Sequence, residues 1–174
     1  MALPLLWLGA AAAATLAGIK YSNKISQHRG YVDVLPGESS LSVKPLDGAV
    51  VCCEVYGVLD HTGIWFDDGV IELNGNGLIR SISAERFLAD RSGEEIFIAC
   101  DTFGHPLIAE HTHTRAVSHL YQYRDYDLLN NNCHRFVWQA VSGVDEPINR
   151  FGDLNQHLSL LHQSSLSWLK MSTN

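Results

Sequence analysis

The chain has 174 residues, of which 46% are hydrophobic and 18% are charged, enough for one globular domain with a buried core. With 12 Lys and Arg side chains against 19 Asp and Glu, the formal net charge is -7, so the basic surface that nucleic acid requires is missing and we expect no nucleic-acid partner. The four cysteines (Cys52, Cys53, Cys100 and Cys133) have neither the spacing of a metal site nor that of a disulfide framework.

The first 19 residues carry no charged side chain and would form a helix about 28 Å long, close to the thickness of the bilayer core. We expect a single N-terminal membrane anchor, and because Lys20, Lys24 and Arg29 follow it, we expect the rest of the chain in the cytoplasm. The alternative is a signal peptide, since the alanine run offers cleavage patterns, and the domain would then be exported, for example to the periplasm. A soluble helix is the third option.

Residues 20–45 are polar and broken by Gly and Pro, which predicts a linker with one short strand near Tyr31–Leu35. The main domain is expected to cover residues 46–174. It begins with a buried strand over Ala49–Val55, which is rich in β-branched residues.

A hairpin is predicted from His61–Phe66 and Val70–Leu73, joined by Asp67-Asp68-Gly69, in which Gly69 would supply the positive φ of a tight turn. The next expected elements are a strand at Leu78–Ile82, a short helix capped by Ser83, a strand at Glu95–Cys100 and a helix within Ile108–Tyr123.

Two helices are predicted near the C-terminus. The first carries apolar residues at helical spacing from Phe136 to Val141 and stops at Gly143, which places Cys133 in its first turn. The second is opened by Asp153 and carries Leu154, Leu158 and Leu161; the apolar tail Leu166, Trp168 and Leu169 then packs on the core or touches a membrane.

Cys133 is the best-placed candidate nucleophile. The unpaired amides of a helix N-terminus favour the thiolate, and they can also hold the oxyanion that forms when a thiolate attacks an acyl carbonyl. Such a nucleophile needs a base and a group that orients the base. His61 can supply the imidazole, and Glu72 on the partner strand can accept its other N–H. A two-residue turn at Asp67-Asp68 would set Asn74 opposite His61, so Asn74 is the second choice for the orienting residue.

Three stretches together resemble the circularly permuted papain-like hydrolases of the NlpC/P60 superfamily, namely the lecithin:retinol acyltransferase-like group and its permuted bacterial and viral relatives. The stretches are HTGIWFDDGVIEL from His61, GLIRSIS from Gly77 with Phe87-Leu88, and Tyr126 through NCHRF at Asn132–Phe136. The resemblance covers roughly Leu46 to Gly143, and the chain order of the three roles is histidine, polar residue, cysteine.

The resemblance implies an α+β fold in which an antiparallel sheet or half-barrel packs against a helix that bears the cysteine at its N-terminus. It also implies that Cys133 is the nucleophile, His61 the base and Glu72 its orienting residue. We expect no cofactor and no metal. His134 directly follows Cys133, and Arg135 stands where the acyltransferase-like group has a histidine. That group also has a second histidine in the third position, so Glu72 is closer to the bacterial and viral branch.

The expected function is a cysteine-dependent acyl-processing enzyme that forms an acyl-thioester from an ester or amide, with a lipid or peptide as substrate. Water as acceptor would make it a thiol protease, amidase or lipase, and an alcohol or amine would make it an acyltransferase. The alternative is a catalytically inactive papain-like module that binds a partner or a membrane. A metal site at His111 and His113 is the third hypothesis, and it lacks a carboxylate or thiol at ligand spacing.

Overall fold

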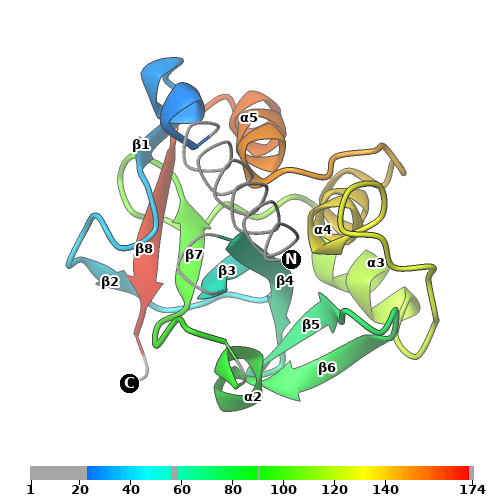
Figure 1. Cartoon of the computed structure of the whole chain (residues 1–174). Coiled ribbons are helices and arrows are strands. Elements are labelled where there is room, and N and C mark those ends of the chain that lie inside the picture. Colours follow the sequence, from blue (N-terminus) through cyan, green and yellow to red (C-terminus); the bar gives the residue numbers. More distant parts are fainter. Residues whose placement is uncertain (1–22, 56–58, 90, 173–174) are drawn as a thin grey trace, which may run out of the picture.

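A computed structural model describes residues 23–172 except 56–58 and 90, so the predicted anchor or signal segment at residues 1–19 lies outside the described residues. The fold is α+β (Figure 1). The strands are β1 (Val32–Val34), β2 (Ser42–Val43), β3 (Val50–Val55), β4 (Leu59–Phe66), β5 (Gly69–Leu73), β6 (Ile79–Ser83), β7 (Phe97–Cys100) and β8 (Leu166–Met171). The named helices are α2 (Ala84–Leu88), α3 (Thr112–Ser118), α4 (Cys133–Ser142) and α5 (Phe151–His162), and residues 23–28 are also helical.

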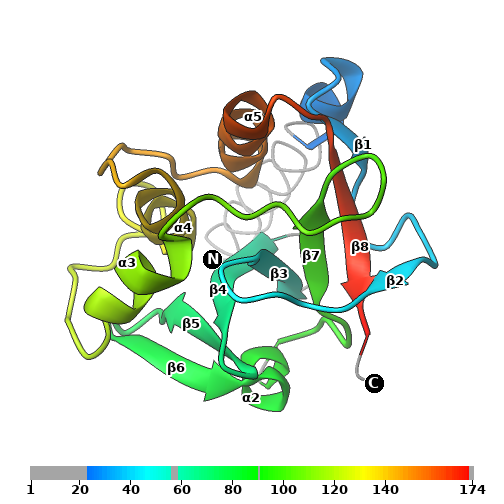
Figure 2. The same ribbon diagram turned by 180° about the vertical axis from the view of Figure 1, so that it is seen from behind.

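The described strands form one sheet in the order β1-β8-β7-β3-β4-β5-β6, with β2 also paired to β8. Along this order, neighbouring strands from β8 to β6 are antiparallel. β1 and β2 each run parallel to β8. Figures 1 and 2 show α3, α4 and α5 gathered along one side of the sheet and α2 at the end of β6. On this side of the sheet the cysteine helix α4 packs against β4.

The β-branched run at the start of the domain forms β3, as predicted. Val50 to Cys53 are all buried, because β3 lies between β4 and β7 and both of its faces are covered. Side chains alternate between the faces of a strand, so Val50 and Cys52 join the core beneath the helices while Val51 and Cys53 join a second core on the other face.

The hairpin of β4 and β5 is also confirmed, but its turn differs from the prediction. Asp67 and Asp68 hold the two positive φ angles, 49° and 54°, whereas Gly69 is the first residue of β5. Gly69 is needed for another reason, since an added Cβ would lie 2.8 Å from the Ile82 carbonyl oxygen on β6. Short acidic side chains tolerate the left-handed conformation, which explains how the two Asp residues form the turn.

The sheet extends into the range predicted as a linker. β1 is the short strand predicted near Tyr31–Leu35, whereas β2 was not predicted. Both lie within residues 20–45, and both pair with β8. The apolar tail at Leu166, Trp168 and Leu169 is β8 itself, buried between β1 and β7. Periodicity could not reveal these pairings, because they join residues at opposite ends of the domain.

The cysteine helix forms as expected. The Asn132 side chain caps α4 by accepting a hydrogen bond from the His134 amide at 3.0 Å, and Gly143 ends the helix with φ 79°. The next helix, α5, starts at Phe151, two residues before Asp153, and its Leu161 is exposed rather than buried. Within the part of the chain that the structure describes, no helix has the length and apolar character to cross a membrane.

Candidate functional site

Cys133 lies at the first position of α4 and lines a cavity of about 450 Å³. The residue is only 4% exposed. Asn132 fixes this helix start with three hydrogen bonds, because its Oδ1 accepts from His134 and its Nδ2 donates to the carbonyls of Leu128 and Asn149, at 2.8 and 2.7 Å. The same three hydrogen bonds therefore position both the N-terminus of α4 and the thiol of its first residue.

His61 and Glu72 meet as predicted: Nε2 of His61 donates to Oε2 of Glu72 at 2.7 Å, and Glu72 is fully buried. The β4–β5 register pairs Ile64 with Ile71, so one step further Glu72 stands opposite Gly63. His61 is then its diagonal neighbour, within reach of a glutamate side chain. Asn74, the second choice, instead accepts a hydrogen bond from the Gly75 amide.

Two arginines complete the surroundings of Glu72. Arg80, its direct partner on β6, reaches Oε1 at 2.8 Å, and Arg91 reaches Oε2 at 2.9 Å. Burial alone would raise the pKa of Glu72, but the hydrogen bond and charge of His61 and the two arginines lower it to about 2. The carboxylate therefore stays ionised and keeps a proton on the His61 nitrogen that faces it.

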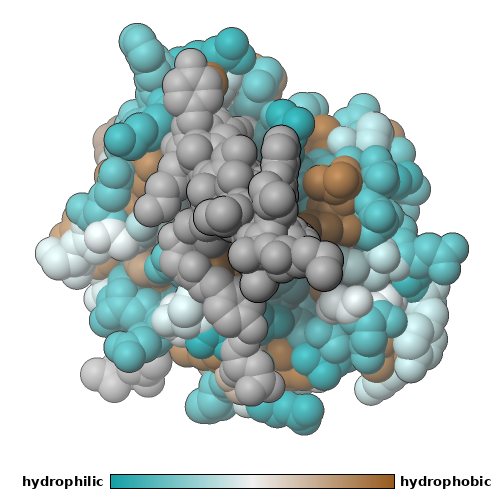
Figure 3. All heavy atoms as spheres, in the orientation of Figure 1, coloured by the Kyte–Doolittle hydropathy of each residue, from teal (hydrophilic) through white to brown (hydrophobic). Residues whose placement is uncertain are grey.

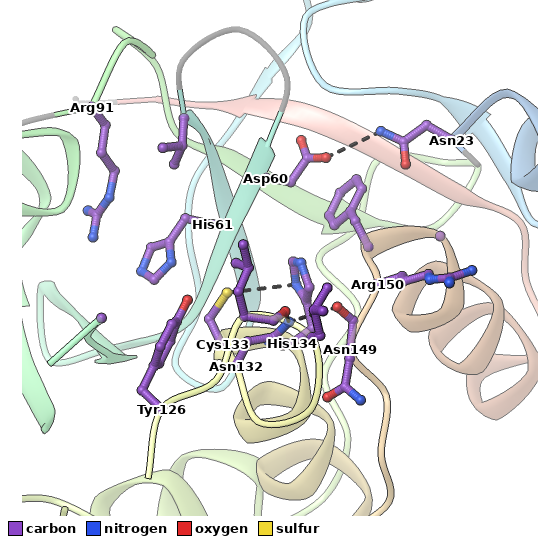
Figure 4. A pocket seen from close by; sticks show the side chains of 16 residues that line it. Asn23, Asp60, His61, Arg91, Tyr126, Asn132, Cys133, His134, Asn149 and Arg150 are labelled. Carbon is purple, nitrogen blue, oxygen red and sulfur yellow. Dashed lines mark hydrogen bonds between the residues drawn. The ribbon is translucent and has the colours of Figure 1, made fainter. Parts of the chain in front are cut away.

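The thiol lies between two imidazoles, those of His61 and His134 (Figure 4). Although burial would raise it, the neighbouring His134 and His61 rings and their hydrogen bonds to the sulfur hold the pKa of Cys133 well below its usual range. In turn, against the effect of burial, Cys133 and Glu72 raise the pKa of His61 to about 9. Because Nε2 faces Glu72, the ring nitrogen of His61 left for the sulfur is Nδ1. The site thus favours a thiolate–imidazolium pair.

His134 was not foreseen as a site residue. Its Nδ1 lies 4.0 Å from the Cys133 sulfur and 3.1 Å from Oγ1 of Thr62, which is fully buried. Two simple periodicities could have drawn attention to His134 and Thr62, although their contact also depends on how α4 packs on β4. Successive helical residues turn by about 100°, so the side chains of Cys133 and His134 leave α4 in different directions. Strand alternation sends Thr62 to the face opposite that of His61.

The wall of the cavity beside His134 carries an acidic group that the sequence did not point to. Asp60 accepts a hydrogen bond from the Asn23 amide at 3.2 Å, and both residues line the cavity (Figure 4). Burial raises the pKa of Asp60 to about 6, and the hydrogen bond from Asn23 and the neighbouring His134 only partly oppose this rise.

The other wall is largely apolar and aromatic. Tyr126 lies on the His61 side with its hydroxyl directed towards the sulfur (Figure 4), and burial together with the Cys133 charge raises its pKa to about 12. Leu128 and Leu129 line the same cavity and are exposed. Figure 3 shows hydrophobic side chains at the surface beside α4, on a face that is otherwise mostly hydrophilic where its described residues are seen.

The remaining candidates take no part in this site. Cys52, Cys53 and Cys100 are buried, and burial raises the pKa of each thiol. His111 precedes α3 and pairs with Glu110 at 3.2 Å, whereas His113 stacks on Phe66 with 5.6 Å between ring centroids. Among residues 23–172, less the undescribed positions, no three His, Cys, Asp or Glu side chains gather in a way that could hold a metal ion.

Comparisons with protein-family models, with curated proteins and with solved structures found no match for this chain. What defines the site is therefore its own geometry on an α+β fold: a buried thiol at a helix N-terminus, an imidazole held by a carboxylate, and a second imidazole held by a hydroxyl.

Proposed function

We propose that this chain is a cysteine-dependent acyl-processing enzyme built on a permuted papain-like scaffold. The observation that carries the proposal is the position of the Cys133 sulfur between the two imidazoles at the wall of a cavity. A merely structural cysteine is a small buried hydrophobe, and its burial disfavours the thiolate. Cys133 has the opposite electrostatic surroundings, and the chain order His61, Glu72, Cys133 agrees with the resemblance.

In the first half-reaction the Cys133 thiolate attacks the carbonyl carbon of an ester or amide. The carbon–sulfur bond forms, the bond to the leaving group breaks, and the leaving group takes a proton from the His61 imidazolium. Glu72 keeps the ring oriented throughout, since it faces the other ring nitrogen. The product is an acyl-thioester.

Donors for the negative charge on the carbonyl oxygen are available beside the sulfur. The His134 amide is committed to the Asn132 cap, and we assign the Cys133 amide, which belongs to the same residue as the sulfur, as the donor at the start of α4. The Tyr126 hydroxyl can add a second hydrogen bond, because it is directed towards the sulfur.

The cavity favours an acyl group with an apolar chain. Phe151 and the exposed Leu128 and Leu129 line it, so a lipid ester or an acylated peptide would bury its chain against them. Membrane association through residues 1–19 fits such substrates and belongs to the same proposal.

Alkylation of the native protein tests the proposal against an inactive binding module. We expect iodoacetamide to label Cys133 rapidly well below pH 8 and to leave Cys52, Cys53 and Cys100 unlabelled. Labelling of Cys133 should be slower in His61→Ala. Mass spectrometry of the labelled peptides gives the rates, with Cys133→Ala as the control. Slow labelling at a rate that does not depend on His61 would favour the inactive binding module over the enzyme.

A second test uses an ester substrate. If Cys133 is activated, it should form a butyryl-thioester when the protein is mixed with p-nitrophenyl butyrate.

A further inference from the structure

The two imidazoles at Cys133 have different partners, and the difference matters for proton transfer. His61 faces a carboxylate, which only accepts hydrogen bonds and therefore favours the charged ring. His134 faces the Thr62 hydroxyl, which can donate to a neutral ring nitrogen and can equally accept from a protonated one. Thr62 thus supports His134 in either protonation state.

The two rings also lie on different sides of the sulfur. His61 is on the side of Tyr126 and Arg91, whereas His134 is on the side of Asp60 (Figure 4). The His134 ring contacts the Thr62 hydroxyl and the Phe151 ring. His134 itself lines the cavity, so a molecule that entered on this side would meet its ring.

We propose that His134 is the general base of the second half-reaction, with Thr62 as its positioning residue; this inference rests on the proposed acyl-thioester function. Water, an alcohol or an amine attacks the thioester carbonyl from the His134 side, and its proton passes to the His134 ring. A bond from the carbonyl carbon to the acceptor forms, the carbon–sulfur bond breaks, and the sulfur leaves as the thiolate.

The proton balance closes through the sulfur. After the first half-reaction His61 is neutral, and after the second His134 carries the extra proton. The thiolate contacts both rings, so it takes the proton from His134 and passes it to His61, which restores the starting thiolate–imidazolium pair. Each imidazole then serves one half-reaction: His61 as acid and His134 as base.

The test separates the two half-reactions with p-nitrophenyl butyrate. Rapid mixing measures the p-nitrophenol burst, which reports acylation, and the steady rate that follows reports deacylation. We expect His134→Gln to keep a burst of about one equivalent, because His61 still pairs with the Cys133 sulfur. The burst becomes slower without the His134 contact, but the steady rate falls by much more, about 10²-fold or more. The butyryl-thioester should accumulate in its mass spectrum, and hydroxylamine should release it. His105→Gln, an exposed histidine outside the cavity, is the matched control and should behave as wild type.

Substitution of Thr62 gives an independent measurement. Thr62→Val removes the hydroxyl from His134 and should slow deacylation about tenfold, whereas Thr62→Ser should restore it. The inference is overturned if His134→Gln deacylates at the wild-type rate, if acylation and deacylation fall by the same factor, or if Thr62→Val and Thr62→Ser behave alike. Absence of any acyl-enzyme in the wild type would instead overturn the proposed function.

Discussion

Glu72 reaches His61 diagonally across Gly63, and this contact depends on the missing side chain of that glycine. A Cβ at Gly63 would lie 2.4 Å from Cγ1 of Val70 and 2.9 Å from the Ile71 carbonyl oxygen. The close approach of β4 and β5 at this point brings the carboxylate to the imidazole at 2.7 Å.

Gly63→Ala should therefore destabilise the protein by about 1–3 kcal/mol, since the new methyl group must push the two strands apart. Thermal unfolding measures the change. Gly75→Ala is the control, because nothing lies within 4 Å of a Cβ at that position. Equal melting temperatures for the two variants would contradict the packing described for Gly63.

Glu72→Gln should move the alkaline limit of activity to lower pH. A raised folded-state pKa means that the His61 proton is held up to about pH 9 and is lost above it, and Glu72 contributes to that rise. Without the carboxylate the imidazolium loses its proton at lower pH, and activity falls with it. The pH profile of kcat/KM for a butyryl ester measures the shift, with Asn74→Ala expected to keep the wild-type profile. An unchanged profile in Glu72→Gln would exclude the ion pair as the source of the limit.

Asp60→Asn should stabilise the fold above pH 6 and have no such effect near pH 3. The pKa of Asp60 rises from 3.8 to about 6 on folding, so the carboxyl reduces stability progressively as the pH passes through this range. The full effect is at most about 3 kcal/mol, from about 1.4 kcal/mol per pKa unit. Melting temperatures at the two pH values test it, with the exposed Asp68→Asn as control. A gain of the same size at both pH values would show that charge is not the cause.

Asn132→Ala should lower stability by about 1–2 kcal/mol and slow the alkylation of Cys133 at pH 6. The substitution removes the cap of α4 and the two hydrogen bonds that tie it to Leu128 and Asn149. Ser83→Ala, which removes the cap of the short helix α2, should affect stability but leave Cys133 alkylation unchanged. Equal alkylation rates in the two variants would show that the Asn132 cap does not contribute to the reactivity of Cys133.

The local elements of this fold could be predicted from the sequence because their signals are local. The β-branched run of β3, the cap at Asn132 and the stop at Gly143 each depend on neighbouring residues. The pairing of β1 and β2 with β8 depends on contacts between distant segments, and no pattern within the predicted linker indicated it.

The same distinction applies to the site. The helix start at Cys133 and the contact between His61 and Glu72 agree with the prediction. His61 contacts Glu72 rather than Asn74, because a glutamate side chain is long enough to span the diagonal between the strands. The role of His134 depends on which side of the sulfur its ring takes, and that is set by how α4 packs on β4. Asp60 likewise gains its raised pKa from burial, which has no signature in its neighbours.

The place of β8 within the sheet has a consequence for synthesis on the ribosome. Among the described strands β1 and β2 are translated first, yet their partner in the sheet is the last strand of the described chain. Contacts between such distant segments form slowly, because a long loop must close before they contribute. The two edge strands therefore leave the exit tunnel without a neighbour, and the sheet is completed only when the final strand follows them.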